Sequence, residues 1–152
     1  MNKIFITKNQ NQTKNLGQKI AKDLLKKYKK NDSALVLGLT GELGGGKTTF
    51  LQGFAKGLGI KNRILSPTFI ILRKLEIKNK KIKFKNFYHI DCYRIKKAKD
   101  ILDLGFEEII SNNKNIIAIE WANIIKKVMP PKSIWIKFEV INEQTRKITI
   151  KY

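Results

Sequence analysis

The chain has 152 residues, of which 42% are hydrophobic and 9% aromatic. This composition favours one globular domain over residues 1–152 and excludes a long disordered or low-complexity chain. The 32 basic and 12 acidic residues give a net charge of +20, which makes nucleic acid a candidate partner. However, only Arg63, Arg73, Arg94 and Arg146 are arginines, and Asn and Ile are abundant, so the codon bias of an AT-rich genome explains the charge equally well. An Arg retained in such a chain hints at a position that needs a planar fork of donors.

The sequence lacks the marks of an exported or membrane protein. A single cysteine, Cys92, excludes an intramolecular disulfide framework and suits a reducing compartment. Residues 1–8 turn polar before any useful apolar signal region, and no run approaches the ~20 apolar residues of a membrane span. We therefore expect a cytoplasmic protein with no membrane partner.

A short strand over residues 3–7 and a helix over residues 13–30 open the chain. Leu16, Ile20, Leu24 and Tyr28 recur at four-residue steps, and lysines occupy the other faces of this helix, most simply as a solvated surface. Thr13 is the expected N-cap. The helix is also a weak candidate for one wall of an adenine site.

Residues 39–50, LTGELGGGKTTF, contain a phosphate-binding loop. Gly41, Gly46, Lys47 and Thr48 fit G-x-x-x-x-G-K-[ST]. The glycines let successive N–H groups point at phosphate oxygens, Lys47 adds a cation, and the Thr48 hydroxyl is a Mg²⁺ ligand. A buried strand over residues 34–39 precedes the loop, and a helix over residues 49–56 follows it, as the motif requires. The expected nucleotide contacts in this stretch are Leu43, Gly44, Gly45, Gly46, Lys47, Thr48 and Thr49.

A β-hairpin is predicted after this helix. Two β-like runs, residues 69–77 and 81–90, are separated by a reversal at Asn79. Ser66-Pro67-Thr68 before them is either an ordinary turn or a hydroxyl-bearing loop that reaches the terminal phosphate or its metal.

Two acids directly follow apolar strands. Asp91 ends the second run of the hairpin, and Glu120 ends the aliphatic strand over residues 115–119. Carboxyl ends of parallel strands meet at one sheet edge, so both acids are candidates for holding Mg²⁺ or orienting water beside the loop. His89 is interpreted as structural because no cluster of metal ligands accompanies it. Trp121 either stacks on a base or partner or fills the edge of the core.

The rest of the chain completes an α/β fold. Residues 100–110 read as two short helices broken at Gly105, Pro130 and Pro131 end a further helix, and residues 133–140 and 145–152 alternate as two strands. Arg146 is interpreted as a surface strand residue, with a phosphate contact as the alternative. We expect a P-loop NTPase fold with a mainly parallel central sheet, flanking helices and antiparallel hairpin strands.

Four motifs together resemble the TsaE (YjeE) family of bacterial P-loop ATPases of tRNA modification: residues 41–50, Ser-Pro-Thr-Phe (66–69), His-Ile-Asp-Cys-Tyr-Arg (89–94) and Ile-Glu-Trp (119–121). The resemblance spans nearly the whole chain, although Gly45 stands where the family commonly has Ala. It implies an ATPase that works with the TsaD and TsaB proteins in forming threonylcarbamoyladenosine in tRNA, without transferring the threonylcarbamoyl group itself.

The same resemblance assigns roles to individual residues. It implies ATP and Mg²⁺ as cofactors, Lys47 and Thr48 as the P-loop lysine and metal ligand, Glu120 as a metal-associated acid and Asp91 as a nucleotide-site acid. Thr68 matches a switch-like loop. Which acid orients the attacking water stays open, and Arg94 or a partner residue is expected to complete the stabilisation of the transition state.

Two other classes remain in competition. A small P-loop kinase of a metabolite shares the loop, but kinases of this kind normally carry an Arg-rich lid, and no segment concentrates Arg. A nucleotide-regulated RNA-binding protein is the other class, motivated by the charge of +20.

Overall fold

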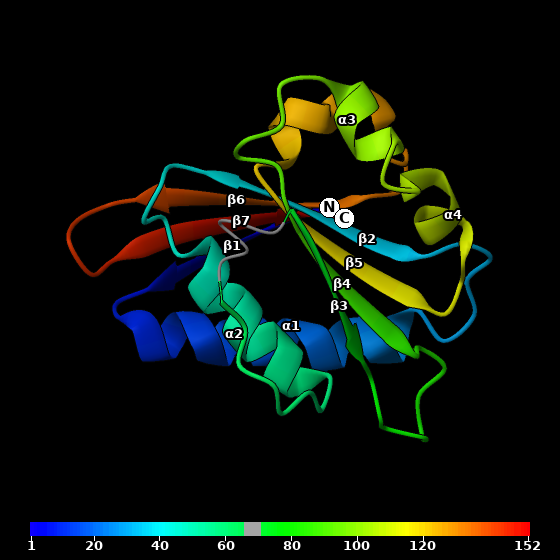
Figure 1. Cartoon of the computed structure of the whole chain (residues 1–152). Coiled ribbons are helices and arrows are strands. Elements are labelled where there is room, and N and C mark those ends of the chain that lie inside the picture. The colour runs from blue at the N-terminus through cyan, green and yellow to red at the C-terminus, as the bar shows by residue number, and fades with distance from the viewer. Residues whose placement is uncertain (66–70) are drawn as a thin grey trace.

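The computed structural model describes residues 1–65 and 71–152 and contains one central sheet (Figure 1). Its strands follow the spatial order β1-β7-β6-β2-β5-β4-β3. The four neighbours β6, β2, β5 and β4 pair in parallel, and β1, β7 and β3 join them antiparallel. The bounds are β1 (Asn2–Thr7), β2 (Leu35–Gly41), β3 (Leu72–Glu76), β4 (Asn86–Asp91), β5 (Asn115–Glu120), β6 (Ile134–Val140) and β7 (Arg146–Lys151). The predicted α/β fold with a parallel centre and two antiparallel hairpins is confirmed.

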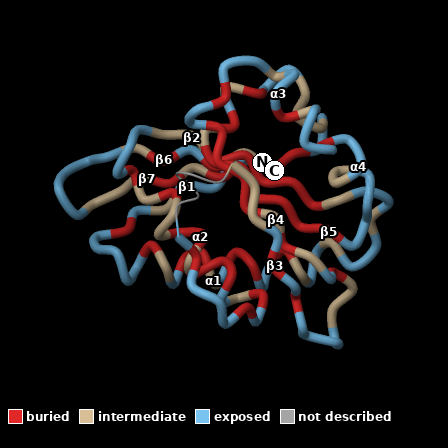
Figure 2. The backbone as a smooth tube through the Cα atoms, in the orientation of Figure 1, coloured by how far each residue is buried: buried red, intermediate tan, exposed pale blue. Residues whose placement is uncertain are grey.

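Helices cover both faces of this sheet (Figure 1). One layer contains α1 (Gln10–Lys27) and α2 (Lys47–Gly57), and the other contains α3 (Ala98–Leu102), α4 (Phe106–Ser111) and the 3₁₀ helix η1 (Ala122–Val128). Each layer has its own apolar core against the sheet. Figure 2 shows the buried path of β5 through the middle of the molecule. A strand covered on both faces needs continuous apolar residues, which is why 116–119 are all aliphatic.

The first helix begins earlier than its apolar spacing predicted. Asn9 is the N-cap, and its side chain accepts a hydrogen bond from the Gln12 N–H at 2.8 Å. The expectation that Thr13 caps the helix is therefore wrong. Thr13 lies inside the helix, where its hydroxyl is buried against the Thr7 hydroxyl at 2.8 Å.

Glycines bring α1 and α2 into close contact. A Cβ added at Gly17 would lie 2.1 Å from the Phe50 carbonyl oxygen, and one added at Gly53 would lie 1.8 Å from the Lys14 carbonyl oxygen. Such distances are far shorter than any real contact, so the two backbones touch directly. This contact fixes α2, and with it the loop that precedes α2, against α1.

The remaining predicted elements are present, but β4 begins at Asn86 rather than at residue 81, and the helix before Pro130 is the 3₁₀ helix η1. Gly105 separates α3 from α4 and takes the left-handed conformation, with φ of 78°. The helix after the glycine-rich loop begins at Lys47, two residues before its predicted start. Over the described residues, no helix is both long and apolar enough to cross a bilayer.

Candidate nucleotide-binding site

The sheet topology brings the glycine-rich loop and the two acids to one edge. β2 runs into the loop, and the loop runs into α2 through Gly46, which has φ of 99°. In the parallel ladders, Glu120 pairs with Leu39 of β2 on one side and with Asp91 of β4 on the other. The ends of three neighbouring strands, β2, β5 and β4, therefore place a phosphate-binding type of loop and two carboxylates side by side.

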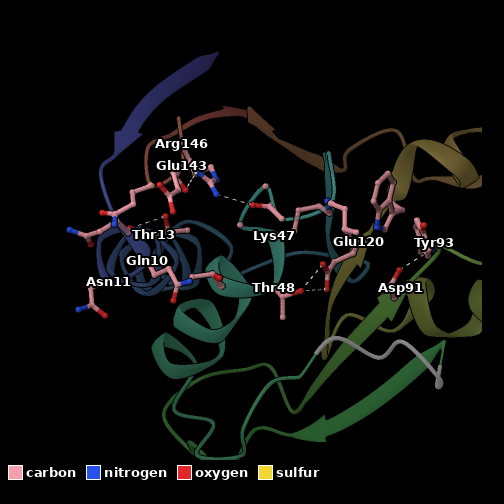
Figure 3. A pocket seen from close by; sticks show the side chains of 18 residues that line it. Gln10, Asn11, Thr13, Lys47, Thr48, Asp91, Tyr93, Glu120, Glu143 and Arg146 are labelled. Carbon is pink, nitrogen blue, oxygen red and sulfur yellow. Dashed lines mark hydrogen bonds between the residues drawn. The ribbon is translucent and has the colours of Figure 1, made fainter. Parts of the chain in front are cut away.

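A cavity of about 850 Å³ lies at this edge (Figure 3). Nearly every candidate site residue of the sequence lines it. Thr68 and the rest of the Ser66-Pro67-Thr68 motif lie outside the described residues. The lining includes Leu43, Gly44, Gly45, Gly46, Lys47, Thr48, Thr49, Asp91 and Glu120.

Lys47 is held by the loop itself. Its ammonium donates to the carbonyl oxygens of Gly41 and Glu42 at 2.6 and 2.9 Å, and lies 4.3 Å from the centre of the Trp121 ring. Burial lowers the pKa of Lys47 below its ordinary value, and the charges of Glu120 and Asp91 partly oppose that effect. Because an ammonium group has three N–H donors, one donor is left for a phosphate oxygen while both carbonyls stay bound.

Glu120 links the loop helix to the sheet. Its two carboxylate oxygens accept the Thr48 hydroxyl at 2.9 and 3.2 Å. One of them also lies 2.6 Å from Nε2 of His89, which is fully buried. Because an ionised carboxylate only accepts, Nε2 carries the proton and donates it. Within the described part of the chain, Nδ1 of His89 has no hydrogen-bond partner. His89 thus fixes the orientation of the Glu120 carboxylate.

Asp91 and the aromatic pair beside it form the other end of the cavity. Asp91 Oδ1 accepts the Tyr93 N–H at 2.9 Å. The Tyr93 and Trp121 rings lie 5.1 Å apart, and Trp121 takes a left-handed backbone conformation with φ of 57°. Figure 3 shows the Tyr93 side chain on the side of Lys47 that faces away from α1.

Several cavity residues were absent from the sequence candidates or, like Thr13 in the possible adenine wall and Arg146, were named only as alternatives. A polar wall lies opposite Asp91. It consists of residues 9–11 and Thr13 at the start of α1 and of residues 143–144 in the β6–β7 turn. Arg146 joins this wall, and its guanidinium donates to the Gly44 carbonyl oxygen at 3.0 Å. The available signal for Arg146 was its identity as one of four arginines in a lysine-rich chain.

The oxygen donors of Thr48 and Glu120 suit a Mg²⁺ ion that is shared with phosphates and water better than a metal ion that protein side chains enclose completely. Over the described residues there is no group of three or more His, Cys, Asp or Glu side chains able to enclose a metal ion. Mg²⁺ in nucleotide sites needs only one or two protein oxygens, since phosphates and water complete its octahedron. Thr48 and Glu120, already in contact, supply such a pair.

Fold and site together define a mixed α/β protein with a phosphate-type loop and two acids at the carboxyl edge of its parallel strands. The family model "Threonylcarbamoyl adenosine biosynthesis protein TsaE" matches residues 7–148. The chain belongs to the TsaE family.

Individual relatives agree with this placement. A protein of Rickettsia felis named tRNA threonylcarbamoyladenosine biosynthesis protein TsaE is 39% identical over 148 residues, covering 97% of this chain and 78% of the relative. A protein of the same name from Bacillus subtilis is 36% identical over 114 residues, covering 75% and 67%. The crystal structure of Bacillus subtilis YdiB matches with a TM-score of 0.75 at 27% identity, covering 99% of this chain and 84% of that one.

Proposed function

We propose that the chain is a P-loop NTPase that hydrolyses ATP during threonylcarbamoyladenosine formation in tRNA, in concert with TsaB and TsaD. The observation that carries the proposal is the meeting of Lys47, Thr48, Glu120 and Asp91 in one cavity at the sheet edge. The names of the curated relatives support the pathway.

The loop and Lys47 would bind the β- and γ-phosphates. Residues 43–48 line the cavity. The Gly45 N–H donates to the Glu42 carbonyl at 2.9 Å and would have to release that bond to reach a phosphate. The remaining N–H donor of the Lys47 ammonium would bind a phosphate oxygen. Burial disfavours the charged form of Lys47. An anion beside this buried ammonium would therefore be attracted more strongly than one beside an exposed lysine.

The acids would divide the remaining work. Thr48 and Glu120 would hold Mg²⁺, which supplies neutralisation of phosphate charge. Asp91, at the neighbouring strand end, would then orient the attacking water. The α1 start and the β6–β7 turn, at the opposite end of the cavity, would receive the nucleoside.

Turnover by the isolated chain is expected to be slow. Arg94 is exposed and is not among the described residues that line the cavity, so a partner residue is the better source of the missing positive charge. ATP hydrolysis would reset the TsaB–TsaD complex between cycles, and tRNA would be met through that complex in the cytoplasm.

The test measures ATP hydrolysis by the purified chain with and without the TsaB–TsaD complex. The proposal expects a low basal rate that rises with the complex and is abolished by Lys47→Ala. Fast hydrolysis by the wild-type chain alone, or no response to the complex, would contradict it.

The charge of +20 favours a second candidate, a nucleotide-regulated RNA-binding protein. In that case tRNA affinity would fall steeply with salt and survive Lys47→Ala. Weak tRNA binding at physiological salt would remove this candidate.

A further inference from the structure

Arg146 connects the carboxyl-terminal hairpin to the glycine-rich loop. It is the first residue of β7, yet its Nη2 donates to the Gly44 carbonyl oxygen at 3.0 Å, across 102 positions of sequence. Its Nη1 donates to the carbonyl oxygens of Asn142, Glu143 and Thr145 at 2.8, 3.1 and 3.1 Å. Figure 3 shows the side chain extended from the hairpin toward the loop, with this bond drawn.

The stem of Arg146 also packs beside the loop. A Cβ added at Gly46 would lie 3.9 Å from Cγ of Arg146 and 3.9 Å from the Phe138 ring. Gly46, which joins the loop to α2, is thus bordered by side chains from both strands of the β6–β7 hairpin. The hairpin therefore contacts the loop through the hydrogen bond at Gly44, and side chains of both its strands lie near Gly46.

The charged guanidinium of Arg146 donates to uncharged acceptors. Among the described residues, its hydrogen-bond acceptors are carbonyl oxygens, and no carboxylate there forms an ion pair with it. A guanidinium that lines the cavity without a counter-ion adds to the attraction of that cavity for an anion.

An arginine fork suits this geometry. Nη1 and Nη2 donate to acceptors on two separate segments, the turn and the loop, from one rigid plane. A lysine would have to reach both segments from one nitrogen, without that fixed spacing between donors. An arginine in a chain where Lys is the common basic residue fits this requirement.

We propose that Arg146 is a positioning residue that orders the phosphate loop by fixing the Gly44 peptide. The expected consequence of this ordering is tighter nucleotide binding, and that part of the inference rests on the proposed nucleotide site. Its structural part, an ordered loop in the free protein, does not depend on the nucleotide.

Two measurements on the full chain separate these parts. Hydrogen exchange of a peptide covering residues 41–48 is followed in the nucleotide-free protein, and ADP affinity is measured by calorimetry. The variants are Arg146→Lys, Arg146→Ala and, as a charge-matched control on the next residue, Lys147→Ala. Loss of a charge-assisted hydrogen bond corresponds to about 10- to 100-fold in affinity. We expect that loss and faster exchange of 41–48 in both Arg146 variants, with neither in Lys147→Ala.

The outcomes distinguish the claims. Wild-type exchange and affinity in Arg146→Lys would overturn the inference. Weaker ADP binding with unchanged exchange would also overturn it, because Arg146 would then contact the nucleotide rather than position the loop. If the wild-type chain binds no nucleotide, the proposed function fails, while exchange still decides whether Arg146 orders the loop. A general loss of stability is recognised by faster exchange throughout β6 and β7.

Discussion

At the scale of single residues, Glu120 and Asp91 differ in their surroundings although they end neighbouring strands. Glu120 is tied to the Thr48 hydroxyl and to His89. Asp91 accepts a backbone N–H from Tyr93. The contact with Thr48 is the reason why the proposed mechanism gives Glu120 the metal and Asp91 the water-orienting role.

Amide substitutions at the two acids should therefore have different effects. Glu120→Gln should weaken the dependence of nucleotide binding on Mg²⁺ and slow hydrolysis by about 100-fold. Asp91→Asn should slow hydrolysis while leaving the Mg²⁺ concentration for half-maximal nucleotide binding unchanged. Mg²⁺ titrations of both variants at fixed nucleotide check this assignment, and the reverse pattern would exchange the two roles.

Cys92 provides a second prediction at this scale. Burial first, and the neighbouring Asp91 charge second, raise the pKa of its thiol to about 12, against about 8.5 for a free cysteine. The thiolate fraction at pH 8 is then on the order of 1 in 10⁴, so iodoacetamide should react only after the chain unfolds. Because the folded pKa is the higher one, the free energy of unfolding should fall as pH rises from about 8.5 toward 12.

Alkylation is followed by mass spectrometry at pH 8 with and without denaturant, and Cys92→Ser controls for reaction at lysines. Rapid modification of the native protein would contradict the burial of this thiol.

At the scale of elements, the contact between α1 and α2 controls the position of the loop. Gly53 of α2 lies against the Lys14 backbone, and Gly17 of α1 lies against the Phe50 backbone. Any side chain there must separate the two helices. Since α2 begins at Lys47, such a separation would also move the candidate site.

Gly53→Ala should therefore lower the free energy of unfolding by about 3 kcal/mol, the upper range for overpacked cores. Gly105→Ala is the matched control, because an added Cβ there meets nothing within 4 Å and strains only a positive φ, at a cost of about 1 kcal/mol. Urea unfolding of both variants measures the difference. Equal effects would mean that the helices can separate freely.

Elements were more predictable than their side-chain contacts. The unbroken aliphatic run before Glu120 indicated a strand buried on both faces, and the parallel-strand rule placed Asp91 beside it. The Asn9 cap was missed because Thr13 also carries a capping side chain and lies nearer the first apolar residue of the pattern. The Arg146 contact with Gly44 depends on how β7 is placed in the sheet, which local periodicity does not determine.

At the scale of the whole molecule, five separated segments of the chain assemble one cavity. The loop and α2 supply Lys47, the strands β4 and β5 supply the acids, and the two ends of the chain supply the polar wall at α1 and the β6–β7 turn. Under the proposed function, a bound nucleotide would contact several of these segments, and this is the route by which its state would reach partner proteins.

The central claim is that nucleotide turnover at Lys47 supports threonylcarbamoyladenosine formation. The most direct measurement depletes the protein in its native cell, quantifies threonylcarbamoyladenosine in bulk tRNA, and attempts rescue with wild type, Lys47→Ala and Lys56→Ala, the last removing an exposed lysine of the same helix. We predict that depletion lowers the modification and that wild type and Lys56→Ala restore it, whereas Lys47→Ala does not. Normal modification after depletion, or full rescue by Lys47→Ala, would contradict the account.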